Sequence, residues 1–263
     1  MSEAKVTGAT DYAIEMDGLT RCFGDFVAVD HVTLRIPKGQ LYGFLGLNGA
    51  GKTTTIRMLT TLLPPSAGAA KLWGHDVMKE PLAVRKLVGL VSDETSESQS
   101  AWTAREYLSY FAHIRHIPDP AEEVERILDD VGLDAKFRGK LIRTYSTGMK
   151  RRVEIARALM GRPKVLFLDE PTRGLDLPAK RDMWSLLRRL AATESVTTFL
   201  SSHDTQEIRS LCSEISVIAG GRLVHTGATR EMGSDIDAFE ECLIGMLTQS
   251  ERFEPPESLF RAE

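Results

Sequence analysis

Residues 46–54 form a glycine-rich segment whose residue types and spacing suit phosphate. The segment reads Gly-Leu-Asn-Gly-Ala-Gly-Lys-Thr-Thr, fits the pattern GxxxxGK[ST], and lies between an apolar run at 41–45 and a helical pattern. Glycines let the backbone wrap closely around phosphate oxygens, while inward-pointing N–H groups and the helix N-terminus supply positive charge. The segment therefore predicts a phosphate-binding loop.

Two side chains of this loop predict chemistry beyond simple binding. We expect the ammonium group of Lys52 to reach the β- and γ-phosphates of a nucleotide and to act in catalysis. We expect the hydroxyl of Thr53 to ligate Mg²⁺, because a hard cation that bridges phosphates prefers oxygen donors. The predicted nucleotide-binding residues of the loop are Leu47, Asn48, Gly49, Ala50, Gly51, Lys52, Thr53 and Thr54.

A second apolar run ends in two carboxylates. The run Val165-Leu-Phe-Leu is followed by Asp169 and Glu170, and carboxylates at the C-terminal end of such a strand point into the crevice where a ligand binds. Asp169 is predicted to hold Mg²⁺, directly or through water. Glu170 is predicted to orient or deprotonate an attacking water. The pair therefore indicates a site that hydrolyses a nucleotide.

The N-terminal elements that position the loop are mainly strands. Strand patterns occupy 12–43, with separate short runs at 27–30 and 32–36. After the loop, a helical pattern runs from Lys52 to about Leu63 and stops at two prolines. We therefore expect a β-rich N-terminal region that leads into the loop and a helix that leads out of it.

In the middle of the chain, apolar residues recur at the spacing of helices, and in the last third strand patterns return between helices. Apolar residues repeat at helical spacing within about 92–160. Strand patterns return at 165–168, 196–200, 215–218 and 223–226. Strands that alternate with helices predict an α/β fold with a largely parallel sheet, and the helical stretch predicts an inserted helical subdomain.

Composition and charge exclude several classes of protein. The chain has 263 residues, of which 42% are hydrophobic and 27% charged, and this composition is typical of a globular protein rather than a disordered one. A formal charge of −4 provides no overall positive field for nucleic acid. The longest apolar run, at 41–47, is far shorter than the roughly 20 residues of a membrane-spanning helix. The three cysteines lack metal-ligand spacing and are expected to be reduced thiols.

With three further motifs, the chain resembles the nucleotide-binding subunit of an ATP-binding cassette (ABC) transporter of the ABC-2 type. Residues 145–150, Tyr-Ser-Thr-Gly-Met-Lys, resemble the signature motif; residues 171–176, Pro-Thr-Arg-Gly-Leu-Asp, resemble the D-loop; and His203 resembles the switch histidine. The resemblance implies a P-loop NTPase core with a mixed sheet, an N-terminal antiparallel β subdomain and an inserted helical subdomain. ATP and Mg²⁺ are the implied cofactors. The expected divisions are a tail at 1–10, a nucleotide-binding domain at 11–232 and a C-terminal helix and tail at 233–263.

The resemblance assigns further residues to the nucleotide. It implies that Ser146, Thr147, Gly148 and Asp176 bind nucleotide, with the signature residues serving the ATP of an opposite subunit. Two such subunits then close head to tail around two ATP molecules.

The resemblance also implies roles for two single side chains. His203 contacts the γ-phosphate and is catalytic, while Phe23 stacks on adenine, a task that needs only the face of an aromatic ring.

Three positions depart from the family pattern. Asp93 stands where the family has the Q-loop glutamine. We expect its carboxylate to accept a hydrogen bond from Mg²⁺-bound water, but the site lacks the N–H donor that the glutamine amide would supply. Thr147 replaces the first glycine of the signature and narrows the approach to phosphate, because its side chain is branched at Cβ. Leu47 replaces a common proline at a position that demands no particular side chain.

The resemblance implies that the chain binds and hydrolyses ATP and so powers an ABC transporter, an exporter rather than an importer, through ATP-driven dimer closure. The expected partners are separately encoded transmembrane permease subunits and a second nucleotide-binding subunit, in a homodimer or a heterodimer. No nucleic acid is expected. The implied location is the cytoplasmic face of the cell membrane, held there through the permease.

Two other functions stay open. A soluble ABC ATPase that acts on ribosomes or nucleic acid usually carries two cassettes or a long coiled coil, and this sequence shows one cassette and no heptad run. A weakly hydrolysing regulatory ATP-binding module is disfavoured by Glu170 and His203 but supported by Asp93 and Thr147.

Overall fold

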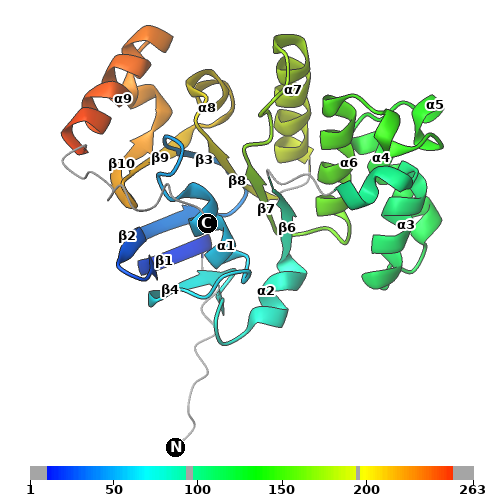
Figure 1. The fold of residues 1–263 in the computed structure, drawn as a ribbon, viewed down its shortest axis with the longest axis horizontal. Coiled ribbons are helices and arrows are strands. Elements are labelled where there is room, and N and C mark those ends of the chain that lie inside the picture. Colours follow the sequence, from blue (N-terminus) through cyan, green and yellow to red (C-terminus); the bar gives the residue numbers. More distant parts are fainter. Residues whose placement is uncertain (1–10, 93–96, 194–195, 251–263) are drawn as a thin grey trace, which may run out of the picture.

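The main sheet has six strands and runs through the centre of the molecule (Figure 1). The computed structural model describes residues 11–92, 97–193 and 196–250. The strand order is β10-β9-β3-β8-β7-β6, with bounds β3 Leu41–Leu45, β6 Val88–Val91, β7 Val165–Asp169, β8 Thr197–Ser202, β9 Glu214–Ala219 and β10 Arg222–Ala228. All neighbours are parallel except β9 and β10. The predicted α/β class with a mixed, largely parallel sheet is confirmed.

The central strands are buried on both faces because alternate side chains enter two separate hydrophobic cores. On one face Phe44, Phe167 and Phe199 pack together, with ring centroids 5.0 and 5.5 Å from that of Phe199. On the other face Leu168 and Leu200 join the core beneath the helices. This double burial fixes the strand ends that carry the polar residues.

A second sheet, of four antiparallel strands in the order β2-β1-β4-β5, faces the main sheet across helix α1 (Lys52–Leu59) (Figure 1). Its strands are β1 Tyr12–Phe23, β2 Phe26–Pro37, β4 Ala67–Leu72 and β5 His75–Asp76. The two short strands expected at 27–30 and 32–36 are one continuous strand. The break between them is an irregularity in register against β1, where His31 has a φ of 51°. The expected N-terminal antiparallel region is present.

Helix α1 ends four residues before the predicted Leu63. Thr61 adopts a φ of 63°, and the N–H groups of Leu62 and Leu63 both donate to the carbonyl of Arg57. A left-handed residue with backward hydrogen bonds of this kind terminates a helix before any proline is reached.

The helical subdomain lies at one end of the molecule and helix α9 at the other (Figure 1). The helices of the helical subdomain are α3 Ala104–Ile114, α4 Pro120–Asp130, α5 Ala135–Arg138 and α6 Thr147–Leu159. Two short 3-10 turns, η1 Glu97–Ala101 and η2 Ile142–Thr144, belong to the same subdomain. Capping residues fix where two of these helices begin. Thr103 and Glu106 form a capping box at the start of α3, and Asp119 caps α4 just before Pro120.

The remaining helices are α2 Pro81–Leu87, α7 Leu177–Thr193, α8 Thr205–Leu211 and α9 Ile236–Ser250, with the 3-10 turn η3 Thr229–Met232. Helix α9 packs Phe239, Leu243 and Leu247 into the core. Within the described ranges, no helix combines the length and the apolar character needed to span a membrane.

Candidate nucleotide-binding and catalytic site

The glycine-rich loop joins β3 to α1, and two of its glycines are required by close backbone approach. A Cβ atom at Gly46 would lie 2.5 Å from the carbonyl oxygen of Ile218. Gly51 has a φ of 107°, and a Cβ atom there would lie 2.6 Å from the carbonyl oxygen of Ala28. These positions let the loop turn sharply into α1, so that the first N–H groups of the helix are available to an anion.

The tip of the loop faces solvent while its base is anchored. The Gly46 N–H donates to the backbone carbonyl of Ser202 at 3.2 Å, and the Gly221 N–H donates to the backbone carbonyl of Ala50 at 3.1 Å. Leu47, Asn48, Gly49 and Thr53 are exposed, Thr54 is half-buried, and Ala50, Gly51 and Lys52 are buried. The predicted phosphate-binding residues therefore form one continuous rim above a fixed base.

Lys52 lies beneath this rim, where its ammonium group is held by two backbone carbonyl oxygens and forms an ion pair with Glu170. Its Nζ atom donates to the carbonyl oxygens of Gly46 at 2.7 Å and Leu47 at 3.1 Å, and it lies 3.1 Å from Oε1 of Glu170. The structure thus brings together the two predicted catalytic residues of the loop and of β7, which are 118 positions apart in the sequence (170 − 52).

Glu170 follows β7 and its backbone is held in an unusual conformation. Its φ is 51°, in the left-handed region that non-glycine residues rarely adopt. Its N–H donates to the carbonyl of Ser201 at 3.1 Å, and its Oε2 atom lies 2.7 Å from Nδ1 of His203. The carboxylate is buried between Lys52 and His203, so three predicted catalytic residues meet at one point.

Asp169 and Thr53 offer oxygen atoms at a neighbouring position. The buried carboxylate of Asp169 accepts from the Ser201 hydroxyl at 2.5 Å. Asp169, Thr53 and Ser92 line one pocket of about 290 Å³. The described part of the chain contains no group of three His, Cys, Asp or Glu side chains suited to a metal. A hard cation would therefore fit here only if phosphate oxygens and water completed its ligands.

The signature and D-loop residues occupy helix starts. The Ser146 hydroxyl accepts from Met149 N–H at 3.3 Å and so caps α6, where Ser146 and Thr147 are exposed and Gly148 is half-buried. Asp176 is exposed and accepts from Ala179 N–H at 2.9 Å at the start of α7.

Two further residues predicted from the resemblance are Phe23 and Asp93. Phe23 ends β1 with 46% of its surface exposed, and the Arg21 guanidinium lies 4.6 Å from its ring centroid, so one face of the ring is covered by a cation. Asp93, predicted as a metal contact, lies outside the described residues.

Arg151 is a residue of the site that the sequence did not indicate. It belongs to α6 and is only 5% exposed. One guanidinium nitrogen donates to the carbonyl of Ser92 at 2.9 Å and another to the carbonyl of Glu170 at 3.5 Å. Arg151 therefore links α6, the helix that begins at the signature residues, to the end of β6 and to the backbone of Glu170, the predicted catalytic carboxylate. It lies in a run of three consecutive cations, Lys150-Arg151-Arg152, a pattern that carries no local sign of burial.

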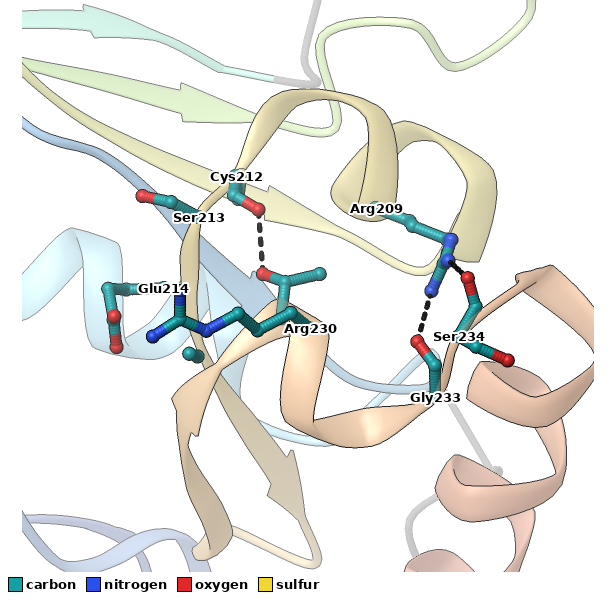
Figure 2. A pocket seen from close by; sticks show the side chains of 9 residues that line it. Arg209, Cys212, Ser213, Glu214, Arg230, Gly233 and Ser234 are labelled. Carbon is teal, nitrogen blue, oxygen red and sulfur yellow. Dashed lines mark hydrogen bonds between the residues drawn. The ribbon is translucent and has the colours of Figure 1, made fainter.

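A second pocket, of about 450 Å³, lies between α8 and the segment η3–α9 (Figure 2). Arg209 donates to the carbonyls of Gly233 and Ser234, and the Thr229 hydroxyl donates to the carbonyl of Cys212. None of the predicted site residues lines this pocket. Its contacts fasten the C-terminal helix to α8, the helix that begins just after His203.

Comparison with known protein families shows which family this chain belongs to. The sequence pattern described as "ABC transporter" matches residues 29–173, more than half of the chain. The chain belongs to the ABC transporter family. This membership confirms the resemblance seen in the motifs.

Two curated bacterial members of the family are similar over most of the chain. The daunorubicin/doxorubicin resistance ATP-binding protein DrrA of Streptomyces peucetius is 39% identical over 226 residues, which cover 85% of this chain and 68% of that protein. The bacitracin transport ATP-binding protein BcrA of Bacillus licheniformis is 38% identical over 211 residues, which cover 80% of this chain and 68% of that protein.

A solved structure shares the fold. The ADP conformation of an ATP-binding cassette of an ABC transporter is 26% identical, with a TM-score of 0.76, over 90% of this chain and 100% of that one. The predicted cassette fold is therefore confirmed. The chain is an ATP-binding and ATP-hydrolysing subunit of a membrane transporter, and the relatives favour this function over action on ribosomes or nucleic acid.

Proposed function

We propose that this chain is the ATPase of an ABC exporter and that Glu170 acts on the attacking water. The observation that supports this role is the position of the Glu170 carboxylate, between the Lys52 ammonium at 3.1 Å and the His203 imidazole at 2.7 Å. If a γ-phosphate binds beside Lys52 and His203, a carboxylate held between these two side chains is placed to orient or deprotonate the attacking water. Lys52 and His203 then stabilise the charge that develops on the phosphate.

Mg²⁺ is part of this proposal. Thr53 and Asp169 would hold the ion, Thr53 directly and Asp169 directly or through water, because both line the pocket beside the phosphate-binding loop. When bound, the ion supplies positive charge that offsets the negative charge of the phosphates. Ser201 orients the Asp169 carboxylate by donating to it. Asp93 is proposed as a further contact to metal-bound water.

We also propose that two cassettes pair head to tail. Ser146 and Thr147 are exposed at the N-terminus of α6, a 13-residue helix, and Asp176 is exposed at the start of α7. A helix N-terminus with exposed N–H groups suits an anion carried by another molecule. In the proposed dimer, Ser146, Thr147 and Asp176 contact the ATP that is bound to the opposite cassette. Phe23 stacks on the adenine of the ATP that is bound to its own cassette.

The surface proposed to receive the permease is an exposed apolar patch formed by Trp102, Tyr110 and Ile114. Tyr110 is 52% exposed, and its ring centroid lies 5.7 Å from that of Trp102. The patch lies on the helical subdomain, close in sequence to Ser92 and Asp93. Contiguous exposed apolar side chains mark interaction surfaces. The chain would then be attached to the cytoplasmic face of the membrane only through its partner.

Export is supported by the names of the relatives, which refer to drug resistance and to bacitracin transport. The cargo itself would contact the membrane partner, so the residues described here do not select it.

Copurification from membranes tests the proposed assembly. The chain should fractionate with membranes and copurify with an integral membrane protein, and Tyr110→Ser with Trp102→Ser should release it. Ile244→Ser is the matched control, since Ile244 is an exposed apolar residue on α9, away from the patch. Copurification with ribosomes, or equal release by the control, would contradict the proposal.

A further inference from the structure

Glu207 is a fully buried carboxyl group for which the proposed mechanism has no role. It lies on α8, four residues after His203, and has an exposed fraction of 0%. Burial raises the pKa of this carboxyl above its usual range, whereas hydrogen bonds from Ser202, Thr172 and Trp184 act in the opposite direction. A buried carboxyl group is costly unless its oxygens are well bonded, so its partners must be strongly determined.

The donors to Glu207 come from three separate segments. Oε2 accepts from the Ser202 hydroxyl at 2.6 Å, and Oε1 accepts from the Trp184 indole N–H at 3.2 Å. The Thr172 hydroxyl also donates to the carboxyl group. Ser202 ends β8, Trp184 lies on α7, and Thr172 lies in the segment 171–176 that follows Glu170. One side chain therefore joins the end of β8, α7 and the D-loop segment.

The contacts around Ser202 bring this network to His203. The Ser202 hydroxyl, while donating to Glu207, accepts from Asp204 N–H at 3.0 Å. The Asp204 carboxylate in turn accepts from Glu207 N–H at 3.1 Å. The residues on both sides of His203 are thus fixed to Glu207, whereas the His203 imidazole is itself exposed and contacts Glu170.

We propose that Glu207 is a positioning residue that holds His203 and the D-loop segment 171–176 in one fixed arrangement beside Glu170. The inference rests on the proposed role of His203 in hydrolysis. A carboxylate suits this task because it accepts from all three donors and offers no competing hydrogen. Through it, movement of the segment that carries Asp176 displaces the residues that flank His203.

Glu207→Gln tests the proposal while keeping the size of the side chain. Its amide group turns one acceptor into a donor, which then faces either the Trp184 N–H or a Ser202 hydroxyl that already accepts from Asp204. We expect kcat for ATP to fall about 10- to 100-fold, since small misplacements of catalytic groups have effects of this size. We expect KM for ATP to stay within about twofold, because the phosphate-binding loop is untouched.

A second variant and a matched control complete the test. Thr172→Val removes one donor without changing shape and should lower kcat in the same direction, which keeps the proposal testable if Glu207→Gln does not fold. Thr205→Val is the control: Thr205 lies on the same helix, but its hydroxyl donates to Glu240 on α9 rather than toward the site. Its kcat should equal that of the unaltered protein.

Three results would overturn the proposal. These are an unchanged kcat in both Glu207→Gln and Thr172→Val, a loss of kcat that disappears when rates are expressed per folded molecule, or an equal loss in Thr205→Val. His203→Ala is measured alongside to separate the two claims. If it retains full activity, the proposed role of His203 is wrong, whatever Glu207 does.

Discussion

The imidazole Nδ1 of His203 lies 2.7 Å from Oε2 of Glu170, across the ends of two neighbouring parallel strands. Register explains the contact: Asp169 pairs with Ser201, so the residues that follow each strand emerge at the same edge of the sheet. Lys52 reaches the other carboxylate oxygen from the start of α1. The Glu170 carboxylate is therefore positioned by two strands and one helix at once.

Replacement of Lys52 tests the phosphate-binding loop. Lys52→Met keeps most of the length but removes the charge that faces Glu170 and the phosphates, so the Kd for ATP should rise by about tenfold or more, as for loss of a charged hydrogen bond. A fluorescent-nucleotide titration measures this. Lys71→Met, at an exposed lysine on β4, should bind normally. Equal affinity in Lys52→Met would contradict the assignment.

Replacement of Arg151 tests the link between the signature helix and catalysis. Arg151→Met removes the donors to the Ser92 and Glu170 carbonyls, which should lower kcat by about tenfold, in line with the free energy of one charged hydrogen bond. Arg151→Lys should recover part of the activity, since one donor can remain. Steady-state ATPase assays check both, with exposed Arg143→Met as control. A full rate in Arg151→Met would exclude this link.

A pH-dependent prediction concerns the helical subdomain. Glu125 accepts from Arg105 and from buried Arg138, and these bonds lower its pKa from 4.5 to about 2, Arg105 having the larger effect. Because the folded pKa is depressed, the stabilisation is present at neutral pH and is lost as pH falls from 4.5 toward about 2. Glu125 is 42% exposed, so solvent limits the effect to about 1 kcal/mol.

Glu125→Gln measures this contribution. Its melting temperature should be about 2 °C below that of the unaltered protein at pH 7, and the gap should close as pH falls through the same window. A gap that is equal at pH 7 and at low pH would show that the carboxylate's charge is not responsible.

Much of this arrangement was predictable because it depends on local pattern. The alternation of strands and helices predicted the sheet, and the position of Asp169 and Glu170 at the end of a buried apolar run predicted that they face a ligand crevice. The loop at 46–54 was predictable because its function requires glycines at fixed spacing.

The remaining features depend on tertiary contacts that leave no local pattern. Lys150, Arg151 and Arg152 are consecutive cations on a helix, so they point in three directions about 100° apart, and only packing determines that Arg151 faces inward. Glu207 reads as an ordinary helix-surface residue, and its burial follows from α7 covering α8. The end of α1 at Leu59 depends on one left-handed threonine.

Glu170→Gln tests the central claim most directly. The amide keeps the shape of the carboxylate but cannot take up a proton from water, so the variant should bind ATP with about normal affinity, run as a stable dimer in ATP on size exclusion, and lose hydrolysis by about 100-fold or more. Glu241→Gln, at an exposed glutamate on α9, should hydrolyse ATP normally. Undiminished hydrolysis in Glu170→Gln would show that this carboxylate does not act on the attacking water.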